Sequence, residues 1–278
     1  MKIFRRVLTV LLLLIFIPSC FLLGKQLLDN KTSDAAYNYA LELALQEKPA
    51  ESPDIAQPEA NATPEGEETG ESVWVPAKVE NDPYMKALER INLDALRKVN
   101  PEVIAWIIIP DTKINYPVLQ TDNNQYYLDH TWEGEKNTVG AIFMEHENST
   151  DFSDYNTIIY GHNMGATGEM FDTVADYKTM EFLEAHPHVY VVNDDGVFRY
   201  DIFASYATHV DSDAFGMVMN WDKTRQEFLD FVLDQSELDT GIVPELKDQI
   251  LTLATCYTYE QRTRWVIQAR LPMVEVIQ

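Results

Sequence analysis

The chain of 278 residues contains only two cysteines, Cys20 in an apolar N-terminal stretch and Cys256 near the C-terminus. No intramolecular disulfide is therefore expected to hold the fold together. Basic residues are also few, with 21 Lys and Arg against 45 Asp and Glu, which gives a formal net charge of −24. This deficit excludes nucleic acid as an expected partner, because phosphate binding requires a concentrated basic surface.

Metal-binding patterns are missing as well. His186 and His188 flank Pro187, but no third ligand follows at a suitable spacing, so no metal site is predicted. The sequence has no internal repeat and no motif that implies a cofactor, and none is expected.

The first 24 residues combine three basic residues with an apolar stretch from Val7 to Gly24. This stretch approaches the ~20 residues of a transmembrane helix, and the charges before it predict a cytoplasmic N-terminus with the remaining chain outside the cell. We expect a single-pass membrane anchor over residues 1–24. A cleaved signal peptide and a lipoprotein signal attached at Cys20 remain as alternatives, although the apolar stretch continues past Cys20.

Residues 25–81 are predicted to connect this anchor to the folded part of the chain. Apolar residues at helical spacing predict a short juxtamembrane helix from Ser33 to Gln46. Residues 48–79 are rich in Pro, Glu, Ala and Thr, a composition typical of an extended linker.

The folded domain is expected to span residues 82–278. Asp82 and Pro83 predict the start of a helix that ends before Asn100. Short apolar, β-branched runs follow, separated by turn residues, and predict seven or eight strands in a closed or nearly closed barrel. These runs are 103–109, 141–144, 157–160, 189–193, 197–207, 250–255 and 265–271. Helices are predicted near 169–176, 179–186 and 222–233, so the fold class is mostly β with peripheral helices.

Cys256 is the candidate nucleophile, because it ends an apolar run and precedes a polar, loop-like segment. A lone cysteine is more often an inert buried residue, but its position at a strand end favours an accessible thiol. A reactive thiol needs a base or a charge partner, which is usually histidine. Of the six histidines, His162 is the best placed, directly after the run 157–160 and Gly161.

Arg264 opens the last long apolar run, so a strand–loop–strand hairpin is expected to return its guanidinium beside Cys256. Such an arginine would stabilise the negative charge that develops on an attacked carbonyl. Arg262 remains an alternative, because side chains two residues apart on a strand share one face.

These segments resemble the sortase family. Thr252-Leu253-Ala254-Thr255-Cys256 is similar to the sortase Thr-Leu-Xaa-Thr-Cys signature, and Tyr160-Gly161-His162-Asn163-Met164 is similar to the histidine segment of that family. Similarity to class B sortases extends through residues 100–107, 116–118, 126–128 and 264–268.

The resemblance implies an eight-stranded sortase barrel with an N-terminal helix, preceded here by the membrane helix and linker. It carries the nucleophile to Cys256, the general acid and base to His162 and the oxyanion-stabilising arginine to Arg264. It further implies that Asn124, Leu128, Ala254 and Thr255 contact the substrate. Many class B members have Ser where this chain has Ala254.

The function implied by the resemblance is that of a cysteine transpeptidase at the surface of a Gram-positive cell. It would cleave a C-terminal sorting signal after Thr through a thioester. It would then transfer the protein to an amino group of a peptidoglycan precursor or a pilin. Two alternatives remain: a cysteine protease that releases the acyl group to water, and a non-catalytic module that binds peptides.

Overall fold

A computed structural model describes residues 2–47, 72–165, 169–256 and 262–277. Within these residues, eight strands close into a barrel in the order β2-β3-β4-β5-β8-β9-β7-β6. Their bounds are β2 Val103–Ile108, β3 Asn115–Leu119, β4 Ile142–Met144, β5 Asn156–Gly161, β6 His188–Asn193, β7 Gly196–His209, β8 Gln249–Cys256 and β9 Thr263–Leu271. The predicted mostly β fold with an eight-stranded barrel is confirmed.

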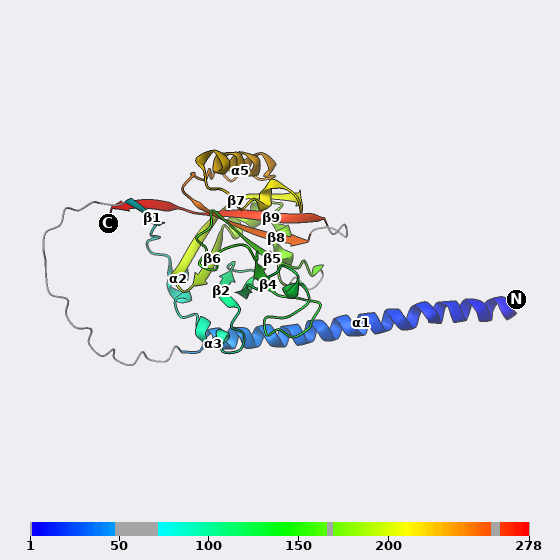
Figure 1. The fold of residues 1–278 in the computed structure, drawn as a ribbon. Coiled ribbons are helices and arrows are strands. Elements are labelled where there is room, and N and C mark those ends of the chain that lie inside the picture. The colour runs from blue at the N-terminus through cyan, green and yellow to red at the C-terminus, as the bar shows by residue number, and fades with distance from the viewer. Residues whose placement is uncertain (1, 48–71, 166–168, 257–261, 278) are drawn as a thin grey trace.

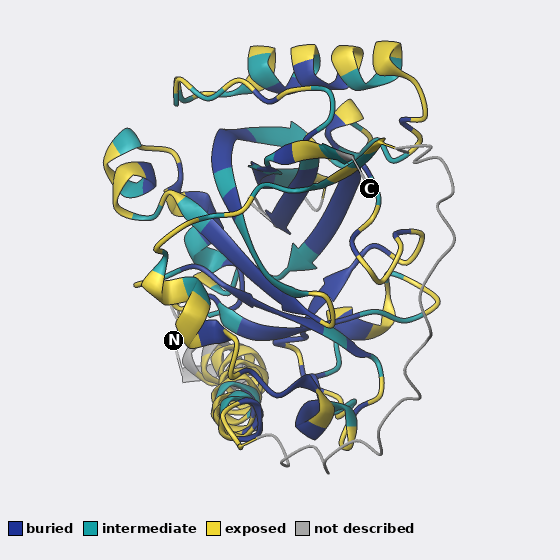
Figure 2. Ribbon diagram, turned by 90° about the vertical axis from the view of Figure 1, so that its left-hand side faces the viewer, coloured by how far each residue is buried: buried dark blue, intermediate teal, exposed yellow. Residues whose placement is uncertain are grey.

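Apolar side chains on alternate positions of the strands make the core. Ile107, Leu253 and Ile267 are fully buried in the largest cluster, which draws on most of the barrel strands. Trp106 and Ile108, at the neighbouring positions of β2, belong to a second buried cluster on the other face of that strand. Strands β2, β4 and β6 are buried on both faces, and their sequences are accordingly nearly continuous apolar runs. Figure 2 shows much of the barrel buried, with parts of its strands intermediate.

Strand pairing brings three strand ends to one rim of the barrel. β5 and β8 are parallel, with Gly161 opposite Thr255, so both strands end at the same rim. β8 and β9 are antiparallel, with Cys256 opposite Arg264, so β9 begins where β8 ends. The central strand of the three is therefore the one that ends at Cys256 (Figure 1).

Helix α5, Asp222–Gln235, covers one side of the barrel beside β7 (Figure 1). It buries Phe228, Leu229 and Val232 against side chains of β7 and β8. The helix predicted over 222–233 is therefore present and extends slightly further.

The helix predicted after Asp82 is divided in two, α2 Pro83–Leu88 and α3 Leu93–Arg97. The carboxylate of Asp82 accepts hydrogen bonds from the first turn of α2, as the sequence predicts. The Asn92 side chain then accepts from the amide of Ala95 at 3.0 Å and begins a second helix.

The remaining short helices lie between strands. They are η1 Tyr126–Leu128, η3 Asp172–Asp176, α4 Met180–Ala185 and η4 Asp213–Phe215. Thr179 caps α4 by accepting a hydrogen bond from the amide of Phe182 at 3.3 Å.

A two-stranded sheet lies outside the barrel. β1, Ser72–Pro76, pairs antiparallel with β10, Met273–Ile277. β1 falls in the stretch that composition alone predicts as linker. Its partner lies at the opposite end of the sequence, so local composition carries no signal for this pairing.

Helix α1, Lys2–Ala44, is a single helix in which the expected anchor and juxtamembrane helix are continuous. Its N-terminal half extends beyond the barrel, and its C-terminal half lies alongside α3 and β3 (Figures 1 and 2). The small residues Ala36, Ala40 and Ala44 are buried in this contact.

The prediction of a transmembrane anchor over residues 1–24 is corrected by this structure. Among the residues that it describes, no helix has both the length and the apolar character needed to cross a bilayer. The stretch from Val7 to Gly24 forms the N-terminal part of α1, which continues without a break through Lys25, Asp29 and Lys31.

Candidate active site

A cavity of about 350 Å³ opens at the rim where β5, β8 and β9 meet. One wall comes from the 124–145 region, another from the ends of the three strands, and the rest from the turn after β7. The polar residues that line it are Asn124, Glu145, Tyr160, His162 and Arg264, and the apolar ones include Leu128, Phe143, Val210, Phe215 and Ala254. The cavity therefore combines both signs of charge with an apolar wall.

Cys256 is the last residue of β8, and its backbone lies directly opposite that of Arg264 on β9. Its side chain and residues 257–261 lie outside the described part of the structure. The backbone register nevertheless fixes which residues of the neighbouring strands flank this position. Thr255, one residue earlier, pairs with Gly161 of β5 and Trp265 of β9.

His162 follows β5 immediately, and its Nε2 lies 2.6 Å from the carbonyl oxygen of Leu128. A carbonyl only accepts hydrogen bonds, so Nε2 carries a proton and donates it. Nδ1 is then the nitrogen that takes up or gives a proton as the ring titrates. The Leu128 carbonyl thus fixes both the tautomer and the orientation of the ring.

Position 161, the last residue of β5 before His162, must be glycine because of close packing and not because of a tight turn. A Cβ added at this position would lie 2.5 Å from Ile142 Cδ1 and 2.6 Å from Phe171 Cγ. Close packing, and not a left-handed backbone, therefore requires glycine before the histidine.

The two candidate arginines occupy different environments. Arg264 is half-buried and lines the cavity. Arg262 is exposed, forms an ion pair with Asp211 and donates from Nε to His209 Nε2 at 3.0 Å. The structure therefore brings Arg264 to the cavity and leaves Arg262 in a surface ion pair.

Glu145 is a functional candidate that the sequence reading missed. It is 6% exposed and follows β4 directly. Its carboxylate accepts hydrogen bonds from the Asn124 amide and, at 2.8 Å, from the Tyr160 hydroxyl, and it lies 2.6 Å from His146 Nδ1. Burial alone would raise the pKa of Glu145, but these hydrogen bonds outweigh it and lower the pKa below its ordinary value.

The pKa of Tyr160 is shifted in the opposite direction. Its burial, together with the neighbouring Glu145 carboxylate, raises its pKa above the usual value, so the phenol stays a neutral donor. The sequence signal that could have identified Glu145 is a carboxylate placed immediately after the buried strand Ile142–Met144.

Three of the four residues predicted to contact substrate line the cavity, and the fourth does not. Asn124, Leu128 and Ala254 line the cavity, whereas Thr255 is 1% exposed and does not. Asn124 is held on two sides, because its Oδ1 accepts from the His146 amide at 2.9 Å while its amide group donates to Glu145. Its orientation is therefore set before any ligand enters.

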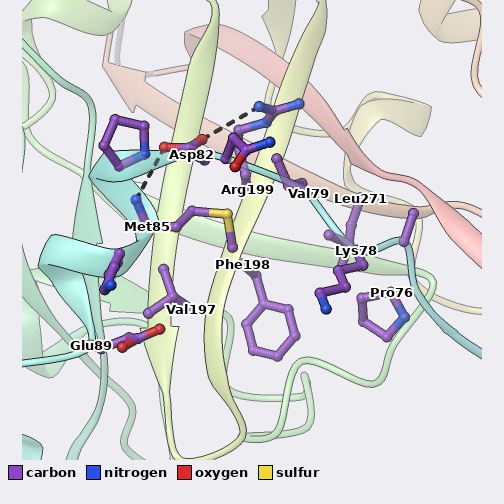
Figure 3. Close-up of a pocket in the computed structure, with 14 residues that line it drawn as sticks. Pro76, Lys78, Val79, Asp82, Met85, Glu89, Val197, Phe198, Arg199 and Leu271 are labelled. Carbon is purple, nitrogen blue, oxygen red and sulfur yellow. Dashed lines mark hydrogen bonds and ion pairs between the residues drawn. The ribbon is translucent and has the colours of Figure 1, made fainter.

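A larger cavity of about 750 Å³ lies between α2, β7 and the segment after β1 (Figure 3). Its main polar contact is the ion pair between Asp82 and Arg199, at 3.4 Å. Asp82 also accepts from the Tyr190 hydroxyl at 3.0 Å and caps α2. These contacts join α2 to the barrel, and none of the predicted catalytic residues lies in this cavity.

Comparison with known proteins agrees with this geometry. A family model described as the sortase domain matches residues 107–272. Sortase B of Listeria monocytogenes is 37% identical over 186 residues, which cover 66% of this chain and 74% of that protein. A 2.0 Å crystal structure of Staphylococcus aureus sortase B superposes with a TM-score of 0.63 at 32% identity, covering 70% of this chain and 92% of that one. A Staphylococcus aureus sortase B–substrate complex superposes with a TM-score of 0.61 at 32% identity, covering 66% and 84%.

The match thus spans the barrel and the rim that carries the cavity, and it agrees with the class B resemblance of the sequence. The chain belongs to the sortase family of transpeptidases, among the sortase B proteins.

Proposed function

We propose that this sortase cleaves a C-terminal sorting signal after threonine and transfers the acyl group to an amine, with Cys256 as nucleophile. The observation that carries the proposal is the cavity in which His162 and Arg264 meet at the strand that ends in Cys256. In this proposal the thiol at the end of β8 joins a proton carrier, His162, and a cationic hydrogen-bond donor, Arg264, which both line the cavity.

In the first half-reaction the Cys256 sulfur, as thiolate, attacks the carbonyl carbon of the threonine. The carbonyl π electrons move to oxygen, and Arg264 donates hydrogen bonds to the resulting oxyanion. When the intermediate collapses, the C–N bond breaks and the departing nitrogen takes a proton from Nδ1 of His162. A thioester on Cys256 and a free amine remain.

In the second half-reaction an acceptor amine attacks the thioester carbonyl, and His162 takes up the proton that the amine loses. Collapse breaks the C–S bond and returns the thiolate, so the cycle conserves its protons. The acceptor we propose is an amino group of a peptidoglycan precursor or of a pilin. Whether the thiol proton rests on Cys256 or on His162 between cycles, the same two residues exchange it.

The substrate chain is proposed to lie along Asn124, Leu128 and Ala254, which line the cavity, and not to contact the buried Thr255. The solved sortase B–substrate complex supports such a peptide site in a relative that is 32% identical. Asn124 presents an amide that Glu145 and His146 hold in place, which suits it to hydrogen-bond a peptide group. Phe143 and Phe215 supply an apolar wall for the substrate side chains.

The test is mass spectrometry of the full-length protein incubated with threonine-containing sorting peptides, with and without an added amine. We expect an adduct on Cys256 that the amine converts to an amide-linked product. Cys256→Ala should abolish the adduct, whereas Cys20→Ala, which removes the exposed cysteine of α1, should not. Release only as free acid would favour a protease. Peptide binding with no adduct in any condition would favour a non-catalytic binding module.

A further inference from the structure

The segment from Asp129 to Ala141 lies between helix α1 and His162. Within this segment, Gly140 contacts the histidine. A Cβ atom added at Gly140 would lie only 2.9 Å from His162 Cδ2. The same Cβ would lie 2.9 Å from the Leu128 carbonyl oxygen, which accepts the hydrogen bond from His162 Nε2. Gly140 also has a φ of +67°, a conformation that favours glycine. Its backbone therefore packs directly against the imidazole ring and the carbonyl that orients it.

Tyr37 of α1 holds this backbone from the other side. Its hydroxyl donates to the Gly140 carbonyl at 2.7 Å. Its ring packs edge-on against Tyr116 of β3, with centroids 5.1 Å apart. Burial raises the pKa of Tyr37 well above its usual value, so the hydroxyl remains a neutral donor.

Tyr116 extends the contact to the segment after the histidine. The hydroxyl of Tyr116 accepts from the Met170 amide at 3.2 Å, and Met170 forms an isolated bridge with Asn163. The next amide, of Phe171, donates to the His162 carbonyl at 2.9 Å. The aromatic pair on α1 and β3 thus contacts both the Gly140 backbone, which packs against the imidazole, and the backbone at Met170, next to the amide that bonds the His162 carbonyl.

Further hydrogen bonds fix α1 on the same segment. Trp132 Nε1 donates to the Ala36 carbonyl at 2.7 Å. Asn137 Nδ2 donates to the Asp29 carbonyl at 2.9 Å, and the Thr138 hydroxyl donates to the Asp29 carboxylate at 2.8 Å. Four residues of one segment therefore contact α1, and the segment cannot shift without breaking several of these bonds.

We propose that Tyr37 is a positioning residue for His162, acting through the Gly140 backbone, so that helix α1 forms part of the support of the active site. The inference rests on the proposed role of His162. Without the Tyr37 hydroxyl, the Gly140 carbonyl loses this donor and the 128–140 backbone relaxes. His162 Nδ1 then departs from its productive position, and a displacement of about 1 Å can reduce a rate by up to ~100-fold.

The experiment compares Tyr37→Phe with Tyr39→Phe in the full-length protein. Tyr37→Phe removes only the hydroxyl and keeps the ring on Tyr116, whereas Tyr39 is 41% exposed on the same helix. We expect Tyr37→Phe to lower kcat for amine transfer by about 3–10-fold with KM within about twofold, and Tyr39→Phe to change neither. Thermal unfolding of each variant, measured in parallel, establishes that the protein assayed is folded.

A second readout reports on His162 itself. We expect the Nε2–H signal of His162, in long-range proton–nitrogen spectra of histidine-labelled protein, to shift or broaden in Tyr37→Phe and to stay unchanged in Tyr39→Phe. Gly140→Ala keeps the Tyr37 hydroxyl and presses a methyl group against the ring, so it should change the same signal.

The two proposals fail in different ways. A wild-type protein that forms no adduct with any peptide contradicts the proposed function, whereas the His162 signal still tests the coupling to Tyr37. A folded Tyr37→Phe protein with wild-type kcat and a wild-type His162 signal would overturn the positioning role.

Discussion

The carboxylate of Glu145 offers a sharp test of how the cavity is built. Glu145→Gln keeps the size of the side chain but removes its charge and replaces one acceptor oxygen with a donor. In the wild-type protein this carboxylate faces the Asn124 amide, the Tyr160 hydroxyl and His146 Nδ1. A glutamine can accept from some of these groups but must also present its own N–H to one of them. At least one charge-assisted hydrogen bond is therefore lost.

The magnitude follows from the number and burial of these bonds. A hydrogen bond to a charged group contributes about 1.5–3 kcal/mol, and part of this loss is recovered by the remaining glutamine oxygen. With Glu145 only 6% exposed, water cannot fully replace the lost partner. We expect Glu145→Gln to lower the free energy of unfolding by about 1–3 kcal/mol at pH 7. Glu147→Gln, on the exposed neighbour, should change it by less than about 0.5 kcal/mol.

The pH dependence gives the direction of the effect. The folded protein lowers the pKa of Glu145, so the ionised carboxylate stabilises the fold. This stabilisation is fully present above the ordinary pKa of glutamate and is lost as the pH falls through the lowered pKa. The difference between wild type and Glu145→Gln should therefore be full at pH 7 and much smaller near pH 3. Urea denaturation of both proteins at the two pH values measures it. A difference of equal size at both pH values would refute the reasoning.

Three further predictions concern other parts of the molecule. Burial and the neighbouring Asp34 raise the pKa of Glu169 to about 7, so wild-type stability should fall as the pH rises from about 5 to 8. Because Glu169 is only half-buried, the effect on stability is small: Glu169→Gln should be more stable than wild type by no more than about 1 kcal/mol at pH 8. At pH 5 the two proteins should be equally stable, and thermal unfolding measures both differences. Arg264→Ala should lower kcat for amine transfer by roughly 100- to 1,000-fold, whereas Arg262→Ala should stay within about twofold; equal losses would contradict the assignment of the cavity arginine. Phe228→Ala should destabilise the protein by about 3–5 kcal/mol, because this ring is 4% exposed under α5, and a loss below 1 kcal/mol in urea denaturation would contradict that packing.

Local sequence patterns were sufficient to predict most of the barrel. β5 and β8 are β-branched, apolar runs bounded by polar residues, and the structure has strands at both. β3 was absent from the predicted runs because Pro117 interrupts a short segment, and proline is disfavoured in strands. β1 escaped prediction for another reason, since its only strand partner among the described residues is β10 at the far end of the chain. The predicted membrane anchor over residues 1–24 is wrong, because no helix among the described residues is long and apolar enough to cross a bilayer.

The candidate site was predictable where strand order alone brings residues together. Cys256 and Arg264 face each other because they end one strand and begin the next, which a hairpin pattern indicates. Glu145 could not be found in this way. Its role depends on Asn124 and Tyr160, which come from separate segments and meet it only in the closed barrel. The same is true of Tyr37, whose partner Gly140 lies far along the chain.

The parallel pairing of β5 with β8 also has a consequence for how the protein folds. Asn156 pairs with Ile250, so the strand that ends in Cys256 cannot join the strand before His162 until almost the entire chain has emerged. Pairings between such distant segments form slowly, because the loop between them must be ordered first. A nascent or partly folded chain therefore carries the cysteine without its histidine. Under the proposed function, an incompletely folded chain is therefore not expected to form the thioester on Cys256 before the barrel closes.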